Sequence, residues 1–274
     1  MKPLVNRRNR FKNFILSPNT IKITTVALIL AAWELFFRIG LLSPFKLPPP
    51  SNLLKAIWEL STKGYPSGKT VLVHIKSTFW RIFQGYMYAA VSAIPLGILI
   101  GSSNILDRLS ANIITFARAI ATISLLPLVI AWFGVGEVSR VILIWYGCFW
   151  VMITNTIQGV KLVDINLINA GRMLGANKKQ IFSRVILPSA SPRIFAGMKI
   201  AVGVAFMVII AVEMIGTTEG LGALIQGARY FYDTDITIAG MIIIGVIGLI
   251  FSVVLDRVER ILLPWASSLK EVKR

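Results

Sequence analysis

Residues 169–192 read NAGRMLGANKKQIFSRVILPSASP, a stretch too polar to stay inside a membrane although apolar runs flank it on both sides. Each flanking run has about the length, roughly 20 residues, that an α-helix needs to cross a bilayer. The stretch is therefore expected to form a large loop between two membrane spans. Positively charged loops face the cytoplasm, and the basic residues of this loop and its edge are Arg172, Lys178, Lys179, Arg184 and Arg193.

Small residues alternate with larger apolar residues within this loop. This pattern predicts a short amphipathic helix whose turn approaches another surface closely. We expect that surface to belong to another protein. The small residues are Ala170, Gly171, Gly175 and Ala176, and the larger ones are Met173, Leu174, Ile181 and Phe182.

The composition predicts an all-α integral membrane protein. The 274-residue chain is 55% hydrophobic and only 15% charged, and its mean hydropathy is +0.73, which is too apolar for a soluble domain. Its formal net charge of +17 does not indicate nucleic-acid binding, because the basic residues lie mainly beside apolar spans, where they orient the chain. One cysteine, Cys148, and one histidine, His74, exclude a disulfide framework and a His/Cys metal cluster. We expect no metal and no cofactor.

Six apolar segments predict six transmembrane helices with both termini in the cytoplasm. Pro95 and Gly97 should interrupt the second of these helices. The segment from Leu41 to Lys76 is expected to be one long external loop despite its five lysines, because the basic tail and the later cytoplasmic segments outweigh them. His74 should pack or cap the helix that follows. The six segments are residues 23–39, 83–100, 113–133, 138–160, 194–216 and 236–255.

The spacing of the polar loop resembles the EAA loop of permease subunits of binding-protein-dependent ABC importers. The usual form is E-A-A, three residues, G, nine residues, I, one residue, L-P. This chain keeps every interval but has Asn169, Gly171 and Val185 at three of the letters. The resemblance implies a type I (MetI-like) permease fold and a surface on which an ABC ATPase docks. The residues expected in that surface are Asn169, Ala170, Gly171, Leu174, Gly175, Ala176, Leu187 and Pro188.

Other runs resemble the sulfonate, taurine, nitrate and bicarbonate group of these permeases, the taurine-type members most closely. They are residues 125–144, 211–216, 234–240 and 256–265. The resemblance implies import of a small anion across the inner membrane, two permease copies, two ATPase subunits and a periplasmic or lipid-anchored binding protein. The expected organisation is a cytoplasmic tail (1–22), a first span with an external loop (23–78), a core permease domain (79–265) containing the cytoplasmic loop 161–193, and a second tail (266–274).

Two other classes of function remain open from the residues alone. One is a membrane anchor or scaffold without a pathway, and the other is a proton-driven secondary transporter. No Gly-rich phosphate loop is present, so ATP hydrolysis is expected in a separate subunit. Polar side chains within spans favour a pathway, since they are costly facing lipid. The candidates are Arg118, Thr122, Ser124, Asn155 and Glu213, the last being the one deep acid that proton coupling could use.

Overall fold

The computed structural model describes residues 18–41, 47–65 and 68–265. This part of the chain is built from helices and contains no strand. Most of the expected N-terminal tail and the whole expected C-terminal tail lie outside the described residues. The elements in order are α2 (Pro18–Arg38), α3 (Pro50–Thr62), α4 (Val71–Ser102), α5 (Asn104–Ala119), η1 (Thr122–Leu125), α6 (Leu126–Phe133), α7 (Glu137–Lys161), α8 (Ile165–Met173), α9 (Lys178–Ile181), η2 (Phe182–Ile186), α10 (Leu187–Glu213), α11 (Leu221–Tyr230) and α12 (Thr234–Leu262).

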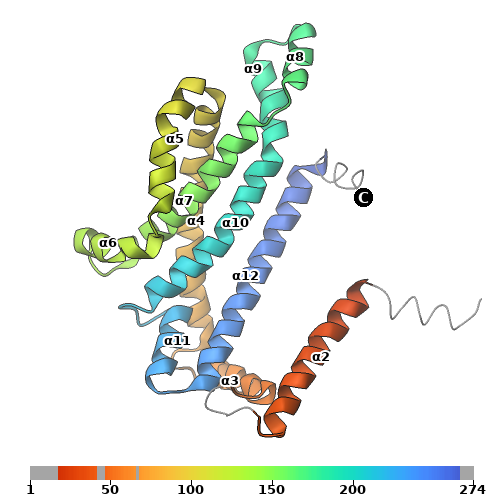
Figure 1. Cartoon of the computed structure of the whole chain (residues 1–274). Helices are drawn as coiled ribbons and strands as arrows, with labels where there is room; N and C mark the ends of the chain where they lie inside the picture. The colour runs from red at the N-terminus through yellow and green to blue at the C-terminus, as the bar shows by residue number, and fades with distance from the viewer. Residues whose placement is uncertain (1–17, 42–46, 66–67, 266–274) are drawn as a thin grey trace, which may run out of the picture.

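Helices α4, α7, α10 and α12 run side by side and form the centre of the molecule (Figure 1). Close approach of α4 and α7 follows from small residues at every fourth position of α4, as in other membrane helix pairs. A Cβ atom placed on Gly85 would lie 2.6 Å from the Cβ of Ile144. Gly197 of α10 gives the same close fit to α7, because a Cβ there would lie 2.5 Å from the Cβ of Asn155. The backbones therefore pack without side chains between them.

Four stretches of the described chain are long and apolar enough to cross a membrane: residues 71–102, 137–161, 178–213 and 234–262. The fourth and sixth expected spans fall within 137–161 and 234–262, and the fifth, 194–216, extends three residues past the end of 178–213. The expected interruption of the second span is wrong, since α4 continues through Pro95. Most of the first expected span is also helical, within α2.

The third expected span is not one straight helix. Residues 104–119 and 122–133 are helical segments bent by 83° relative to each other. Ile120 and Ala121, which connect the two segments, have extended backbone dihedrals. Pro127 then occupies the first turn of α6, where its missing N–H is no loss. Counted as one span, this bent pair is the fifth.

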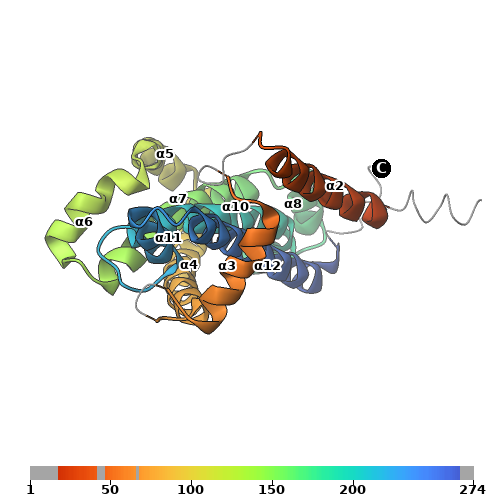
Figure 2. The ribbon, with the colours of Figure 1, turned by 90° about the horizontal axis from the view of Figure 1, so that it is seen from below.

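The two ends of the bundle carry different short helices (Figure 1). α8 and α9 stand at one end, and α3 and α11 lie at the other, where α3 packs against α12. The expected external loop from Leu41 to Lys76 is therefore wrong in part, because it contains α3 and the start of α4. Viewed along the bundle, α6 and α2 lie on opposite sides of it (Figure 2).

An ion-pair group ties α12 to α10. The Lys199 ammonium of α10 contacts the carboxylates of both Asp256 and Glu259, three residues apart on α12. Residues at this spacing lie on one face of a helix. The contact fixes α12 against the N-terminal half of α10.

Candidate functional site: the α8–α9 loop and the ionic cluster at the opposite end

Helix α8 begins at Ile165, four residues before Asn169, the first residue of the EAA-like motif. The Asp164 side chain caps it by accepting a hydrogen bond from the Asn166 backbone N–H at 2.8 Å. Asn169 therefore lies in the middle of α8 and is not an N-cap. Its exposed side chain accepts a long contact of 3.5 Å from the Arg172 guanidinium.

Gly175 ends α8 in a Schellman motif. The Gly175 N–H donates to the Arg172 carbonyl at 3.0 Å, and the Ala176 N–H donates to the Gly171 carbonyl at 3.1 Å. This pair of bonds requires a left-handed residue after the helix, and Gly175 has φ +78°. No other atom lies within 4 Å of a Cβ placed there. Gly175 thus allows the left-handed backbone of the turn, and no protein atom packs against the side on which a Cβ would lie.

The chain returns to the membrane through α9 and a single π-helical turn. Asn177 and Gln180 form a reciprocal capping box with two bonds of 2.9 Å, which fixes the start of α9. The turn η2 then leads directly into α10, where Pro188 lies in the first helical turn. Gly171 of α8 faces this returning segment, with Ile181 and Val185 atoms 3.7 Å from its Cβ position.

Two large apolar side chains at the tip of the loop point into solvent. Met173 is 89% exposed and Leu174 is 88% exposed. Together with the open face of Gly175 they make an apolar tip. An exposed apolar patch of this kind marks an interaction surface. Of the expected surface residues, Leu174, Gly175 and Ala176 form the turn at the tip. Asn169, Ala170 and Gly171 lie within α8, with Gly171 facing the returning segment, and Leu187 and Pro188 lie at the base in α10.

The candidate pathway residues fall into three places. Arg118 lies in the last turn of α5, and Thr122 and Ser124 lie in η1 just after the bend, so these three share the corner between α5 and α6. Arg118 is exposed and lines a cavity of about 620 Å³ between α5 and α7. Asn155 instead packs against Gly197 at the α7–α10 contact and donates to its own helix at 2.8 Å.

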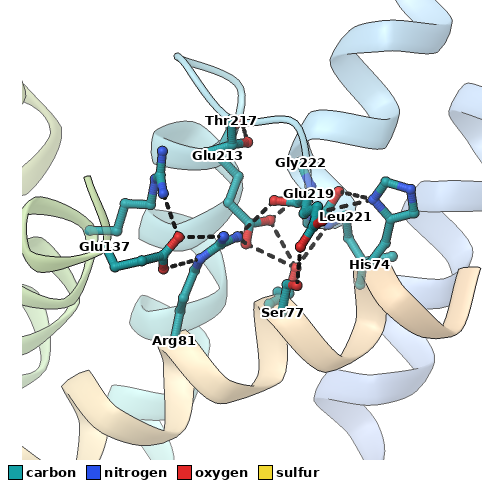
Figure 3. A network of polar contacts seen from close by, with 12 residues as sticks. His74, Ser77, Arg81, Glu137, Glu213, Thr217, Glu219, Leu221 and Gly222 are labelled. Carbon is teal, nitrogen blue, oxygen red and sulfur yellow. Dashed lines mark hydrogen bonds and ion pairs between the residues drawn. The ribbon is translucent and has the colours of Figure 1, made fainter. Parts of the chain in front are cut away.

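Glu213, the last candidate, lies in an ionic cluster at the end of the bundle opposite the α8–α9 loop (Figures 1 and 3). Its side chain is completely buried. The Arg81 guanidinium donates to Glu213 at 2.7 Å and holds Glu137 by two further bonds of 2.6 and 2.7 Å. Arg140 also donates to Glu137 at 2.6 Å. Two arginines and two glutamates thus balance in charge and join α4, α7 and α10.

Neutral donors complete the environment of Glu213. Its oxygens accept bonds from the Thr78 hydroxyl at 2.9 and 3.0 Å and from the Gly222 backbone N–H at 3.0 Å. His74 is fully buried beside them, within 2.9 Å of the carbonyls of Gly220 and Tyr65. The histidine therefore packs the start of α4 against the turn before α11, which is the packing role expected for it.

Sequence reasoning missed Arg81, because the second span was expected to begin two residues later, at Phe83. The available signal was an arginine within an apolar run that also holds Thr78, since a buried charge needs a partner. Its partners could not be read from the sequence, because Glu137 and Glu213 come from helices far apart in the chain. Arg81, Arg140 and Glu213 are buried, the Glu137 side chain is 59% exposed, and together the four side chains join three helices.

A second polar contact lies near the cluster, outside the spans. The Tyr65 hydroxyl donates to Asp233 at 2.8 Å. Burial, with the Asp233 carboxylate beside it, raises the pKa of Tyr65 to about 12. The phenol therefore stays protonated and joins the segment before α4 to the start of α12.

Comparison with known proteins identifies the family. Residues 93–268 match the family described as "Binding-protein-dependent transport system inner membrane component". The chain belongs to this family. The permease is 34% identical to the taurine transport system permease protein of Escherichia coli (strain K12) over 90% of each chain. It is 32% identical to a protein of Bacillus subtilis (strain 168) named as an aliphatic sulfonates transport permease, over 88% of this chain and 86% of the relative.

The fold agrees with that of a solved ABC transporter chain. The permease superposes with a TM-score of 0.58 on a chain of the MetNI methionine ABC transporter in an inward-facing conformation, covering 69% of this chain and 94% of the other at 20% identity. It is a multi-pass inner-membrane subunit of an ATP-driven importer that works with a binding protein. ATP hydrolysis belongs to separate ATPase subunits.

Proposed function

We propose that this permease carries a small anion, a taurine-like sulfonate first and nitrate or bicarbonate next. The relatives described above are named for taurine and aliphatic sulfonates. The charge distribution supports an anion as well. Residues 108–212 include two acids, Glu137 and Asp164, and Arg81 and Arg140 neutralise the first. A region poor in acids favours negatively charged cargo.

The observation that carries the proposed mechanism is the exposed tip of the α8–α9 loop. Its residues keep the EAA spacing, and Met173 and Leu174 extend from it almost fully exposed. We assign this tip as the surface that docks into the ATPase subunit. The capping box and the continuous helical path through η2 into α10 then give a stiff connection from the ATPase to the bundle.

A second copy of the chain is proposed to cover α5 and α6. Helix α5 has no buried residue, although it is strongly two-sided. Its apolar side chains Ile113 and Phe116 are 65% and 71% exposed, and Trp132 of α6 is 68% exposed. A homodimer would bury these faces and leave the corner of Arg118, Thr122 and Ser124 near the space between the two copies. We therefore propose these three as pathway residues, and a structural role for Asn155 and Glu213.

The proposed orientation follows from the same assignment. If the α8–α9 tip meets an ATPase, this end of the bundle is cytoplasmic and α3, α11 and the ionic cluster are external. Both chain termini are then cytoplasmic. The basic residues of the loop agree with this orientation.

Substrate class is tested by the cognate binding protein. Calorimetric titration with taurine, an alkanesulfonate, nitrate and bicarbonate, followed by uptake of the preferred compound through the reconstituted importer, should show preference for the sulfonates. Preference for a cation or an uncharged compound would overturn the anion assignment while leaving the importer class intact.

A further inference from the structure

A cavity of about 1160 Å³ lies between the α8–α9 loop and the adjacent ends of α4 and α7. One side of it belongs to α8, α9 and η2, and the other to the last residues of α4 and α7. Its wall is largely apolar, formed by Val160, Val163, Ile168, Ile181, Phe182 and Ile186.

The charged residues of the lining are all basic. Lys161, Arg172 and Lys178 are among the lining residues, and these include no acid. Lys161 is already paired with Asp107 at 2.6 Å. Arg172 and Lys178 are exposed, and neither forms an ion pair with an acid in the part of the chain that the structure describes. Two unbalanced positive charges therefore border an apolar wall.

The position of the cavity matches the headgroup level of a bilayer. It is bounded by Ser102 and Lys161, the last residues of two spanning helices, and by Lys178 and Phe182, at the start of the apolar stretch 178–213. A small free anion would use the basic side chains but not the apolar wall. An amphiphile with an anionic head and a hydrocarbon tail would use both.

We propose that this cavity binds an anionic phospholipid of the inner leaflet, with its phosphate on Arg172 and Lys178 and an acyl chain against the apolar wall. The leaflet rests on the proposed orientation of the α8–α9 loop. Because the two walls belong to the loop and to the bundle, a lipid seated between them braces one against the other. Coupling through the loop then depends on anionic lipid.

The test compares lipid retention by variants of the full-length permease. The protein is reconstituted in nanodiscs with equal amounts of phosphatidylglycerol and phosphatidylcholine. It is then extracted, loosely bound lipid is washed away, and the lipid that remains bound is measured by native mass spectrometry. We expect the wild type to retain phosphatidylglycerol selectively and Arg172→Gln/Lys178→Gln to retain it about 30-fold less, from two lost charge contacts. Lys179→Gln is the matched control, because this neighbouring exposed lysine does not line the cavity.

Two further arms separate a lipid from a free anion. Val163→Phe narrows the cavity and keeps every charge, so this variant should also lose phosphatidylglycerol. Added inorganic phosphate should not displace the lipid from the wild type. Equal retention by the double variant and the wild type would overturn the proposal. So would equal retention of phosphatidylcholine, or displacement by phosphate with no effect of Val163→Phe. Lipid retention is measured without ATPase or substrate. A failure of the lipid proposal therefore leaves the proposed transport function untouched, and a failure to transport leaves the lipid result untouched.

Discussion

Replacing Gly175 by aspartate tests whether the α8–α9 tip is a docking surface. In the isolated permease the effect should be modest. No atom lies within 4 Å of the new Cβ, so there is no clash. The left-handed φ of +78° disfavours side chains by about 1 kcal/mol, and Asp and Asn tolerate it better than most residues. An acid at the end of α8 also opposes the helix dipole by roughly 0.3–1 kcal/mol.

A docked tip should respond much more strongly. Met173 and Leu174 beside the glycine are almost fully exposed and would be buried by an ATPase. An unpaired carboxylate placed in that contact should cost on the order of 2 kcal/mol. This weakens docking about 30-fold. Gly175→Asn is the matched control, because it has the same size and similar backbone tolerance without the charge.

The assay measures membrane insertion, co-purification of the ATPase and substrate-stimulated ATP hydrolysis. We expect both variants to insert at wild-type levels, Gly175→Asp to lose the ATPase and transport, and Gly175→Asn to keep most of both. Wild-type transport by Gly175→Asp would refute the assignment of the tip. Equal loss in both variants would attribute the effect to the backbone turn instead.

Three further outcomes are expected. Glu213→Gln should lower the unfolding free energy by about 3 kcal/mol, because it leaves Arg81 buried with one anionic partner fewer. Glu137→Gln should cost less, because the Glu137 side chain is 59% exposed. Melting temperatures of the two variants in detergent that agree within about 2 °C would contradict this. The Lys69 ammonium lowers the pKa of Glu219, so the Glu219–Lys69 pair stabilises the fold above the ordinary carboxyl pKa of about 4.3 and loses this effect as the pH falls through the lowered value. The melting difference between wild type and Lys69→Gln should therefore shrink to nothing in acid, and a constant difference would disprove it. A cysteine at Ser67, which lies outside the described residues, should react with an impermeant reagent in intact spheroplasts while one at Ser183 reacts only after lysis, and the reverse pattern would invert the proposed orientation.

Apolar length predicted the later spans well because a bilayer imposes it. The expected segments 138–160 and 236–255 fall within α7 and α12, and the expected segment 194–216 runs three residues past the end of α10 at Glu213; none of the three helices is interrupted. The bend in the third span was not predictable in the same way. Ile120 and Ala121, which adopt extended backbone there, are apolar residues without a turn signal, and apolar length is the same for a straight and a bent helix.

The α8–α9 loop depends on residues that are close together in the sequence, whereas the ionic cluster joins residues that are far apart in it. Gly175 ends α8 through contacts within one short stretch, and the spacing of the motif placed it in the loop. The capping box of Asn177 and Gln180 is equally local but was not predicted. The Arg81–Glu213 contact joins residues 132 positions apart, and it depends on which helices are neighbours. Helix neighbours depend on close contacts such as Gly85 with Ile144, which hydropathy does not report.

The central claim is that this chain is the permease of an ATP-driven importer. The most direct test is uptake of radiolabelled sulfonate into proteoliposomes that contain the permease, its ATPase subunits and the binding protein. We predict uptake that requires ATP on the side of the ATPase subunits, requires the binding protein, and continues when an uncoupler collapses the proton gradient. Uptake that proceeds without ATP, or that stops when the proton gradient is removed, would contradict it.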